Sequence, residues 1–363
     1  MNNIPYLLAL HSIDGLGPIR LKALLDHFKD PKLAWEADLR KIRETGVPKN
    51  VAELLVETRK SLDPRGYAQS IKDMGIKWLT IFDDNYPKLL KEIYDPPVIF
   101  YIKGEILKQD QNAIAIVGTR KMTGYGRVVT KGFVEELVSA GLTIVSGLAR
   151  GVDTLAHLSA IKNGGRTLAI LGGGINNIYP PENIKLVTDI INGKGAVISE
   201  FSPDEPSMPG NFPARNRIIA GLSLGVLVTE AAEDSGSLIT ARLALEEGRE
   251  VFAVPGPITS NLSAGTSQLI KNGARLVTST EDILQELGID LDKGRGKNKR
   301  GIADNLSGIE EAILESLENE HKHVDEICRE LKTTSANISS ALIKLEISGL
   351  VKSLGGGNYI KSL

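Results

Sequence analysis

The sequence has little cysteine, little net charge and no long apolar run. One cysteine, Cys328, among 363 residues excludes a disulfide framework and a cysteine-rich zinc site, and is typical of a reducing compartment. The 43 lysines and arginines nearly balance the 45 aspartates and glutamates, so nucleic-acid binding would need a local basic patch. No apolar run approaches the ~20 residues of a membrane-spanning helix, and the first residues lack the pattern of a secretory signal. These absences predict a cytoplasmic protein with no membrane segment and no metal site.

The spacing of the apolar residues changes along the chain. Residues 1–65 show helical spacing and predict a small helical domain. Within 66–288, two strands are expected at 77–82 and 98–103, and from 113 onward apolar runs alternate with segments of helical period. The expected strands of this alternating region are 113–117, 143–145, 167–171, 196–199, 225–229, 251–254 and 275–277. This pattern predicts an α/β fold with a doubly wound, mostly parallel, Rossmann-like sheet.

The last part of the chain has a different pattern. Residues 289–306 are charged, contain glycine and predict a basic linker. Residues 307–363 follow the order helix, helix, turn, helix, hairpin, which is typical of a winged helix. The sequence therefore predicts two domains flanking the sheet, one helical and one winged-helix.

Glycine-rich loops follow three successive strands of the predicted sheet, at 118–126, 146–153 and 172–180. Ligands of doubly wound sheets bind beyond the carboxyl ends of the strands. Glycines let a phosphate approach the backbone, and Arg120 and Arg150 could bind it bidentately. The dinucleotide fingerprint G-x-G-x-x-G and the P-loop pattern are both absent, so no nucleotide cofactor is predicted.

The densest basic element lies at the expected start of a later helix. Arg215 and Arg217 flank Asn216 there, and Phe212 precedes them. Two guanidiniums, an amide and an aromatic ring suit a phosphate backbone with a base stacked beside it. Acidic residues that could pair with these arginines instead are Glu200, Glu205 and Glu230. Because ion-pair networks imitate binding sites, both interpretations are open at this stage.

Catalysis has less support in the sequence. Acidic and hydroxyl residues do gather at 230–237, but no histidine lies near them. His157 is the only histidine of the sheet region and is expected to pack on a helix or lie at the surface. No nucleophile and base can be paired, so the protein is not expected to be an enzyme.

Both flanking domains have alternative interpretations. The stretch Ile13–Pro18 suits a helix-hairpin-helix that meets a DNA phosphate through its backbone, or a tight turn that needs glycine. The expected recognition helix near 333–344 carries few basic groups, so the winged helix could contact protein rather than DNA.

Several motifs in the predicted sheet domain occur in a specific order. They are Val117-Gly-Thr-Arg120, Ser146-Gly-Leu-Ala-Arg-Gly-Val-Asp153, Gly172-Gly-Gly with Tyr179-Pro180, Phe212-Pro-Ala-Arg-Asn-Arg-Ile-Ile-Ala-Gly-Leu-Ser223, Ser235-Gly-Ser237 and Val254-Pro-Gly256. Over about 70–280 the chain thereby resembles the bacterial DNA-processing protein A family (DprA, also called Smf). Members of that family often carry a helical N-terminal domain of the sterile-alpha-motif or helix-hairpin-helix kind and a C-terminal winged helix.

The resemblance implies a protein that acts without catalysis, cofactor or metal. The family binds single-stranded DNA, self-associates, and helps load the RecA recombinase during natural transformation, so single-stranded DNA, RecA and a second copy of the chain are the expected partners. By position in the motifs, the expected DNA-binding residues are Gly118, Arg120, Ser146, Gly147, Arg150, Phe212, Arg215, Asn216 and Arg217.

Two other functions compete with this one. A Rossmann-like nucleotide hydrolase would need a P-G-G-x-G-T-x-x-E loop, and the nearest stretch, 230–242, lacks the tandem glycines. A transcriptional regulator would need sequence-specific duplex binding by 307–363, for which the charge pattern gives little support.

Overall fold

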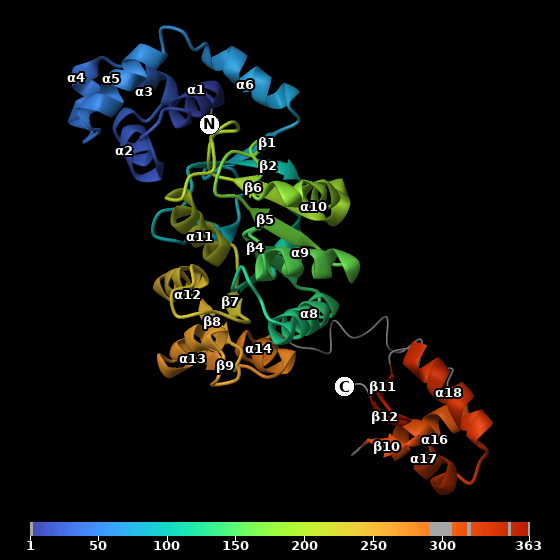
Figure 1. Cartoon of the computed structure of the whole chain (residues 1–363). Helices are drawn as coiled ribbons and strands as arrows, with labels where there is room; N and C mark the ends of the chain where they lie inside the picture. The colour runs from blue at the N-terminus through green and yellow to red at the C-terminus, as the bar shows by residue number, and fades with distance from the viewer. Residues whose placement is uncertain (1–2, 290–306, 318–320, 348–349, 362–363) are drawn as a thin grey trace. The chain divides into compact units, whose positions relative to one another are not determined.

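The computed structural model describes residues 3–289, 307–317, 321–347 and 350–361. They form two compact units, one on each side of residue 290, and each is visible in Figure 1. Most of the predicted basic linker, 290–306, lies outside the described residues. Among the residues that are described, no helix is long and apolar enough to cross a membrane.

The first unit begins with short helices around their own apolar core. They are α1 (Ile4–His11), α2 (Pro18–Phe28), α3 (Pro31–Glu36), α4 (Leu39–Glu44), α5 (Lys49–Thr58) and α6 (Pro64–Asp73). Asp30, Asp38 and Asp63 each begin a helix by accepting hydrogen bonds from backbone N–H groups of its first turn. The predicted boundary at 65/66 falls inside α6, whose Ile71 packs in one cluster with Tyr101 of the sheet. The division into separate domains at this point therefore stays a prediction.

A nine-stranded sheet forms the centre of the unit. Its strands are β1 (Lys77–Thr80), β2 (Ile99–Gly104), β3 (Ala113–Val117), β4 (Thr143–Ser146), β5 (Thr167–Ile170), β6 (Gly195–Ser199), β7 (Gly225–Val228), β8 (Glu250–Ala253) and β9 (Arg275–Leu276). Their order is β1-β2-β6-β5-β4-β3-β7-β8-β9. The strands from β3 onward are all parallel to one another, and β1 and β2 extend the sheet as antiparallel strands. The mostly parallel α/β sheet predicted from the sequence is confirmed.

Helices cover both faces of this sheet (Figure 1). They are α7 (Lys88–Lys91), α8 (Gly124–Ser139), α9 (Val152–Lys162), α10 (Ile184–Asp189), α11 (Asn211–Gly221), α12 (Ser237–Glu246), α13 (Ala264–Lys271) and α14 (Thr280–Glu286). Shorter turns are η1 (Lys108–Gln111), η2 (Pro181–Asn183), η3 (Ile190–Lys194) and η4 (Asn261–Ser263). The strand order reverses between β3 and β7, so the loop after β3 opens at the position where doubly wound sheets bind ligands, and the loops after β4 and β5 follow it along the same edge of the sheet.

The second unit has the predicted winged-helix order. It contains α16 (Gly308–Ser316), β10 (Lys322–His323), α17 (Val324–Glu330), α18 (Ser335–Ile347), β11 (Val351–Gly355) and β12 (Asn358–Lys361). Strand β10 was not expected from the sequence; it pairs with β12, giving the sheet order β10-β12-β11. Ile313, Ile327 and Leu342 are buried together between the helices and this small sheet.

Candidate nucleic-acid interface

Three loops meet at the carboxyl ends of β3, β4 and β5. Thr119 of the first loop accepts a hydrogen bond from the backbone N–H of Val152, and its own N–H donates to the carbonyl of Glu230 at 2.7 Å. Gly151 has φ +78°, and a Cβ there would lie 2.2 Å from the Thr119 carbonyl oxygen. Only glycine fits at this close approach of two loops, which brings Arg120 and Arg150 to the same edge of the sheet.

Two arginines flank a pair of neighbouring aromatic rings across these loops. The Arg120 guanidinium carbon lies 5.8 Å from the centre of the Phe212 ring. The Phe212 and Tyr179 rings are 6.0 Å apart at 45°, and the Arg150 guanidinium lies 5.7 Å over Tyr179. We call Arg120, Phe212, Tyr179 and Arg150 the arginine–aromatic row. Both arginines and Tyr179 are exposed and Phe212 is half-buried, so the row offers cations for phosphates and rings for bases.

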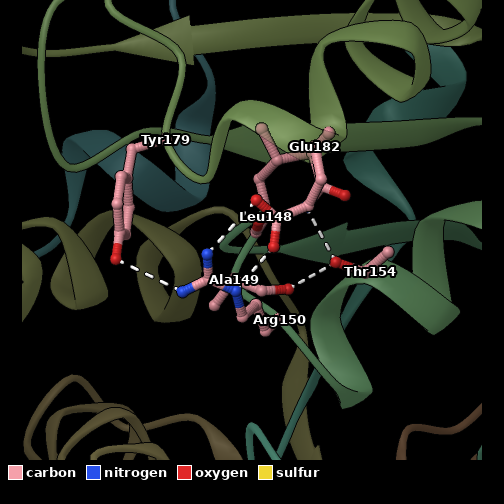
Figure 2. Close-up of polar contacts among 7 residues, drawn as sticks. Leu148, Ala149, Arg150, Thr154, Tyr179 and Glu182 are labelled. Carbon is pink, nitrogen blue, oxygen red and sulfur yellow. Dashed lines mark hydrogen bonds and ion pairs between the residues drawn. The ribbon is translucent and has the colours of Figure 1, made fainter.

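Arg150 is held by an acidic partner that the sequence did not reveal (Figure 2). Its Nε and Nη2 donate to the two carboxylate oxygens of Glu182 at 2.6 and 3.2 Å, and Nη1 lies 3.4 Å from the Tyr179 hydroxyl. The hydrogen bond from Arg150 lowers the pKa of Glu182 below its ordinary value. The backbone beside Arg150 is fixed as well, because Thr154 donates to the Ala149 carbonyl at 2.6 Å and Asn183 to the Leu148 carbonyl at 2.8 Å.

Arg215 lies beneath the loops rather than on their surface. Only 4% of it is exposed, and its Nη1 donates to the carbonyls of Gly147, at 2.6 Å, and Ile170. The guanidinium therefore joins the ends of β4 and β5. Burial lowers the pKa of Arg215 to about 10 and raises that of the neighbouring Asp153 to about 6. None of the three carboxylates considered in the sequence accepts a described hydrogen bond from Arg215.

Arg217 forms the ion pair that was the alternative to DNA binding. Its Nη2 lies 2.6 Å from both carboxylate oxygens of Glu200, and its Nε lies 3.0 Å from Asp95. Both side chains of the Arg217–Glu200 pair are less than a tenth exposed. Glu230 has another role, since it accepts hydrogen bonds from the backbone N–H and the hydroxyl of Thr123 at the start of α8.

The remaining expected residues lie at different depths. The Ser146 hydroxyl is fully buried and donates to the Ile116 carbonyl at 2.7 Å. A Cβ on Gly147 would lie 2.7 Å from the Arg215 guanidinium, and one on Gly118 would lie 2.7 Å from the Glu230 carbonyl oxygen. Asn216 is half-buried and accepts from Arg215 at 3.2 Å. The structure thus brings Arg120, Arg150, Phe212 and Asn216 toward the surface and places Ser146, Gly147, Arg215 and Arg217 below it.

Two residues of the arrangement, Tyr179 and Glu182, were missed as site residues. Tyr179 belongs to a motif that the sequence shows, Tyr-Pro after the three glycines, and this was the available signal. Nothing in the sequence indicated that Glu182 contacts Arg150.

His157 packs inside the sheet domain, as the sequence favoured. It is fully buried, and its Nδ1 lies 2.6 Å from the Thr167 hydroxyl. That hydroxyl donates to the Ile144 carbonyl, so Nδ1 carries the proton, and Nε2 has no hydrogen-bond partner among the described residues. Burial lowers the pKa of His157 to about 3.

We expect this histidine to make the protein sensitive to acid. Because the folded-state pKa is depressed, the unfolded chain binds a proton below about pH 6.5 and the folded chain does not. Stability present above that pH is lost as the pH falls, by about 1.4 kcal/mol per pH unit. Urea unfolding of wild type and His157→Asn between about pH 6 and pH 5 checks this. A stability difference that stays constant with pH would contradict it.

Comparisons with known proteins agree with the fold and the motifs. Residues 77–288 match the family model of DNA recombination-mediator protein A, and 298–357 match the DprA winged helix domain. Protein Smf of Synechocystis is 35% identical over 389 residues, covering 98% of each chain. The X-ray structure of DNA processing protein A from Streptococcus pneumoniae superimposes with a TM-score of 0.69 at 39% identity, covering 79% of this chain and 99% of that one. A structure of DNA processing protein A from Helicobacter pylori, which concerns the single-stranded DNA binding mode of that protein, superimposes with a TM-score of 0.52 at 32% identity. The match covers 58% of this chain and 95% of that one.

Proposed function

The chain belongs to the DNA recombination-mediator protein A family, and from that membership we propose that it binds single-stranded DNA along the arginine–aromatic row. The observation that carries the proposal is the row in which Arg120 and Arg150 flank the neighbouring rings of Phe212 and Tyr179, with successive distances near 6 Å. Single strands offer phosphates and unstacked bases together, and the arginines and rings of this row offer a partner to each. Neither group reads a sequence, so the binding is expected to be sequence-tolerant.

The nine residues expected from the sequence divide into two roles in this proposal. Arg120 and Arg150 bind phosphates, Phe212 stacks on a base, and Asn216 and the Gly118 backbone assist them. Below them, the residues that shape the loops are Ser146, Gly147, Arg215 and Arg217. Support for the second role comes from the bonds of Arg215 to the ends of β4 and β5 and from the buried pair of Arg217 with Glu200.

We propose further that the protein acts with RecA, as a homodimer, on DNA entering the cytoplasm during natural transformation, and that it performs no catalytic step. These parts follow from the family resemblance. No residue is assigned to the RecA contact or to the dimer surface.

The proposal is tested by fluorescence anisotropy with an unstructured single-stranded oligonucleotide and its duplex, each over a salt series. We expect single strands to bind more tightly, with affinity that falls steeply as salt rises because counterions leave the contacted phosphates. Preference for duplex would move the site to the winged helix or to the hairpin at 13–18. No binding to either, with release of free base from nucleoside monophosphates, would favour the hydrolase instead.

Replacing one arginine of the row makes the test specific. Arg120→Ala is expected to weaken binding to all sequences alike and to reduce the slope of log affinity against log salt by about 0.7, the value for one phosphate contact on a single strand. The matched control is Arg275→Ala, which removes an exposed arginine from β9 at the edge of the sheet. Equal effects of the two substitutions would show that only general charge is involved.

A further inference from the structure

The ion pair between Arg150 and Glu182 occupies the Nε–Nη2 edge of the guanidinium, one of the edges through which an arginine binds a phosphate. Glu182 accepts one hydrogen bond each from Nε and Nη2 of Arg150 through its two oxygens, and Nη1 lies beside the Tyr179 hydroxyl (Figure 2). A phosphate binds the same edge of a guanidinium with the same two-oxygen geometry. Carboxylate and phosphate therefore cannot both bind this edge of Arg150 at once.

The pair is built so that the partners can be exchanged. The two side chains are 51% and 50% exposed, so solvent and DNA can reach them. Exposed ion pairs contribute little free energy and are easily replaced. By contrast, the backbone on both sides is fixed, because Asn183, next to Glu182, donates to the Leu148 carbonyl and to the Thr154 hydroxyl. Replacing the carboxylate by a phosphate needs only rotation of the side chains. The Tyr179 ring can stay in contact with the Arg150 guanidinium during this exchange.

We propose that Glu182 competes with the DNA phosphate for Arg150 and thereby limits how tightly this end of the row holds a single strand. The inference rests on the proposed function, because it assumes that Arg150 is a phosphate ligand. It goes further by assigning to Glu182 an opposing role in the same site. The alternative is that Glu182 orients Arg150 for the phosphate. The two roles predict opposite results for a substitution of Glu182, since removing an orienting group weakens DNA binding and removing a competitor strengthens it.

The experiment uses anisotropy with a single-stranded oligonucleotide and four forms of the full chain: wild type, Glu182→Gln, Arg150→Ala, and the double variant. Glu182→Gln is expected to bind about two- to fivefold more tightly, which is the gain from no longer breaking a surface ion pair. Its salt slope should stay close to that of wild type, because Arg150 contacts the phosphate in both complexes and the variant only lacks the ion pair that wild type must break. The double variant should bind the single strand no more tightly than Arg150→Ala alone, because the arginine for which Glu182 competes is gone.

The control variant is Glu286→Gln, which releases Arg275 from a comparable exposed arginine–glutamate pair at the edge of the sheet. It should bind as wild type does. Unchanged or weaker binding by Glu182→Gln would overturn the inference in favour of an orienting role. A gain of equal size with and without Arg150 would overturn it in favour of general repulsion. If wild type itself does not bind single strands, the proposed function fails; if wild type binds and only the gain is missing, this inference alone fails.

Discussion

Arg217→Ala is expected to lower the free energy of unfolding by about 3–5 kcal/mol, the usual cost of removing one partner from a buried ion pair. Arg217 supplies Nη2 to Glu200 and Nε to Asp95, and Glu200 is nearly inaccessible to water. Burial already raises the pKa of Glu200, and Arg217 opposes that shift. Without the guanidinium, the Glu200 carboxylate must lie uncompensated in the core or take up a proton.

Urea unfolding followed by tryptophan fluorescence measures this loss. Both tryptophans, Trp35 and Trp78, lie in the first unit and therefore report on it. The control is the double variant Arg217→Met with Glu200→Gln, which removes both charges of the buried pair and leaves only the partly exposed Asp95 without its arginine. It should recover much of the lost stability. If Arg217→Ala keeps full stability and loses single-strand binding, Arg217 is a direct DNA ligand and its proposed structural role is wrong.

The fold was predictable from the sequence because it depends on patterns that are local. Strands buried on both faces need continuous apolar runs, so 113–117 and 225–229 could be recognised from their composition, and β3 and β7 lie there. The helical periods between them fixed the parallel arrangement, since parallel neighbours need a crossover connection.

The depth of each site residue was not predictable in this way. Arg215 and Arg217 are two positions apart on α11, and a helix lying on the sheet with only one covered side would not bury both so deeply. They are buried because α11 packs against β5, α7 and α12 together. This arrangement involves distant parts of the chain, and the motif alone does not encode it.

The pairing of Arg150 with Glu182 was not predictable for the same reason, because it too joins distant parts of the chain. Glu182 lies 32 residues further along the chain, at the turn η2, and meets Arg150 only because β4 and β5 are neighbours in the sheet. Adjacent loops could be inferred from the predicted topology, but which side chain crosses from one to the other depends on loop geometry. The sequence therefore indicated which loops come together at this edge of the sheet, and not the acidic group that pairs with Arg150 there.

Gly151→Ala is expected to destabilise the protein by about 2–5 kcal/mol, combining a left-handed backbone conformation with a steric collision. The residue has φ +78°, and its new Cβ would lie 2.2 Å from the Thr119 carbonyl oxygen and 2.7 Å from the Arg120 backbone. Backbone atoms cannot rotate away as a flexible side chain can, so the loop carrying Arg120 must move.

A second glycine of the same unit separates the two costs. Gly164 has φ +73°, and a Cβ added there would meet no atom within 4 Å, so Gly164→Ala carries only the conformational cost of about 1–2 kcal/mol. In urea, the free energy of unfolding of Gly151→Ala should be clearly lower than that of Gly164→Ala. Equal values would mean that the loop adapts to the added Cβ without cost. In anisotropy, Gly164→Ala should bind single strands as wild type does. Gly151→Ala should lose affinity as Arg120→Ala does, because the close approach of the two loops is what brings Arg120 to the row.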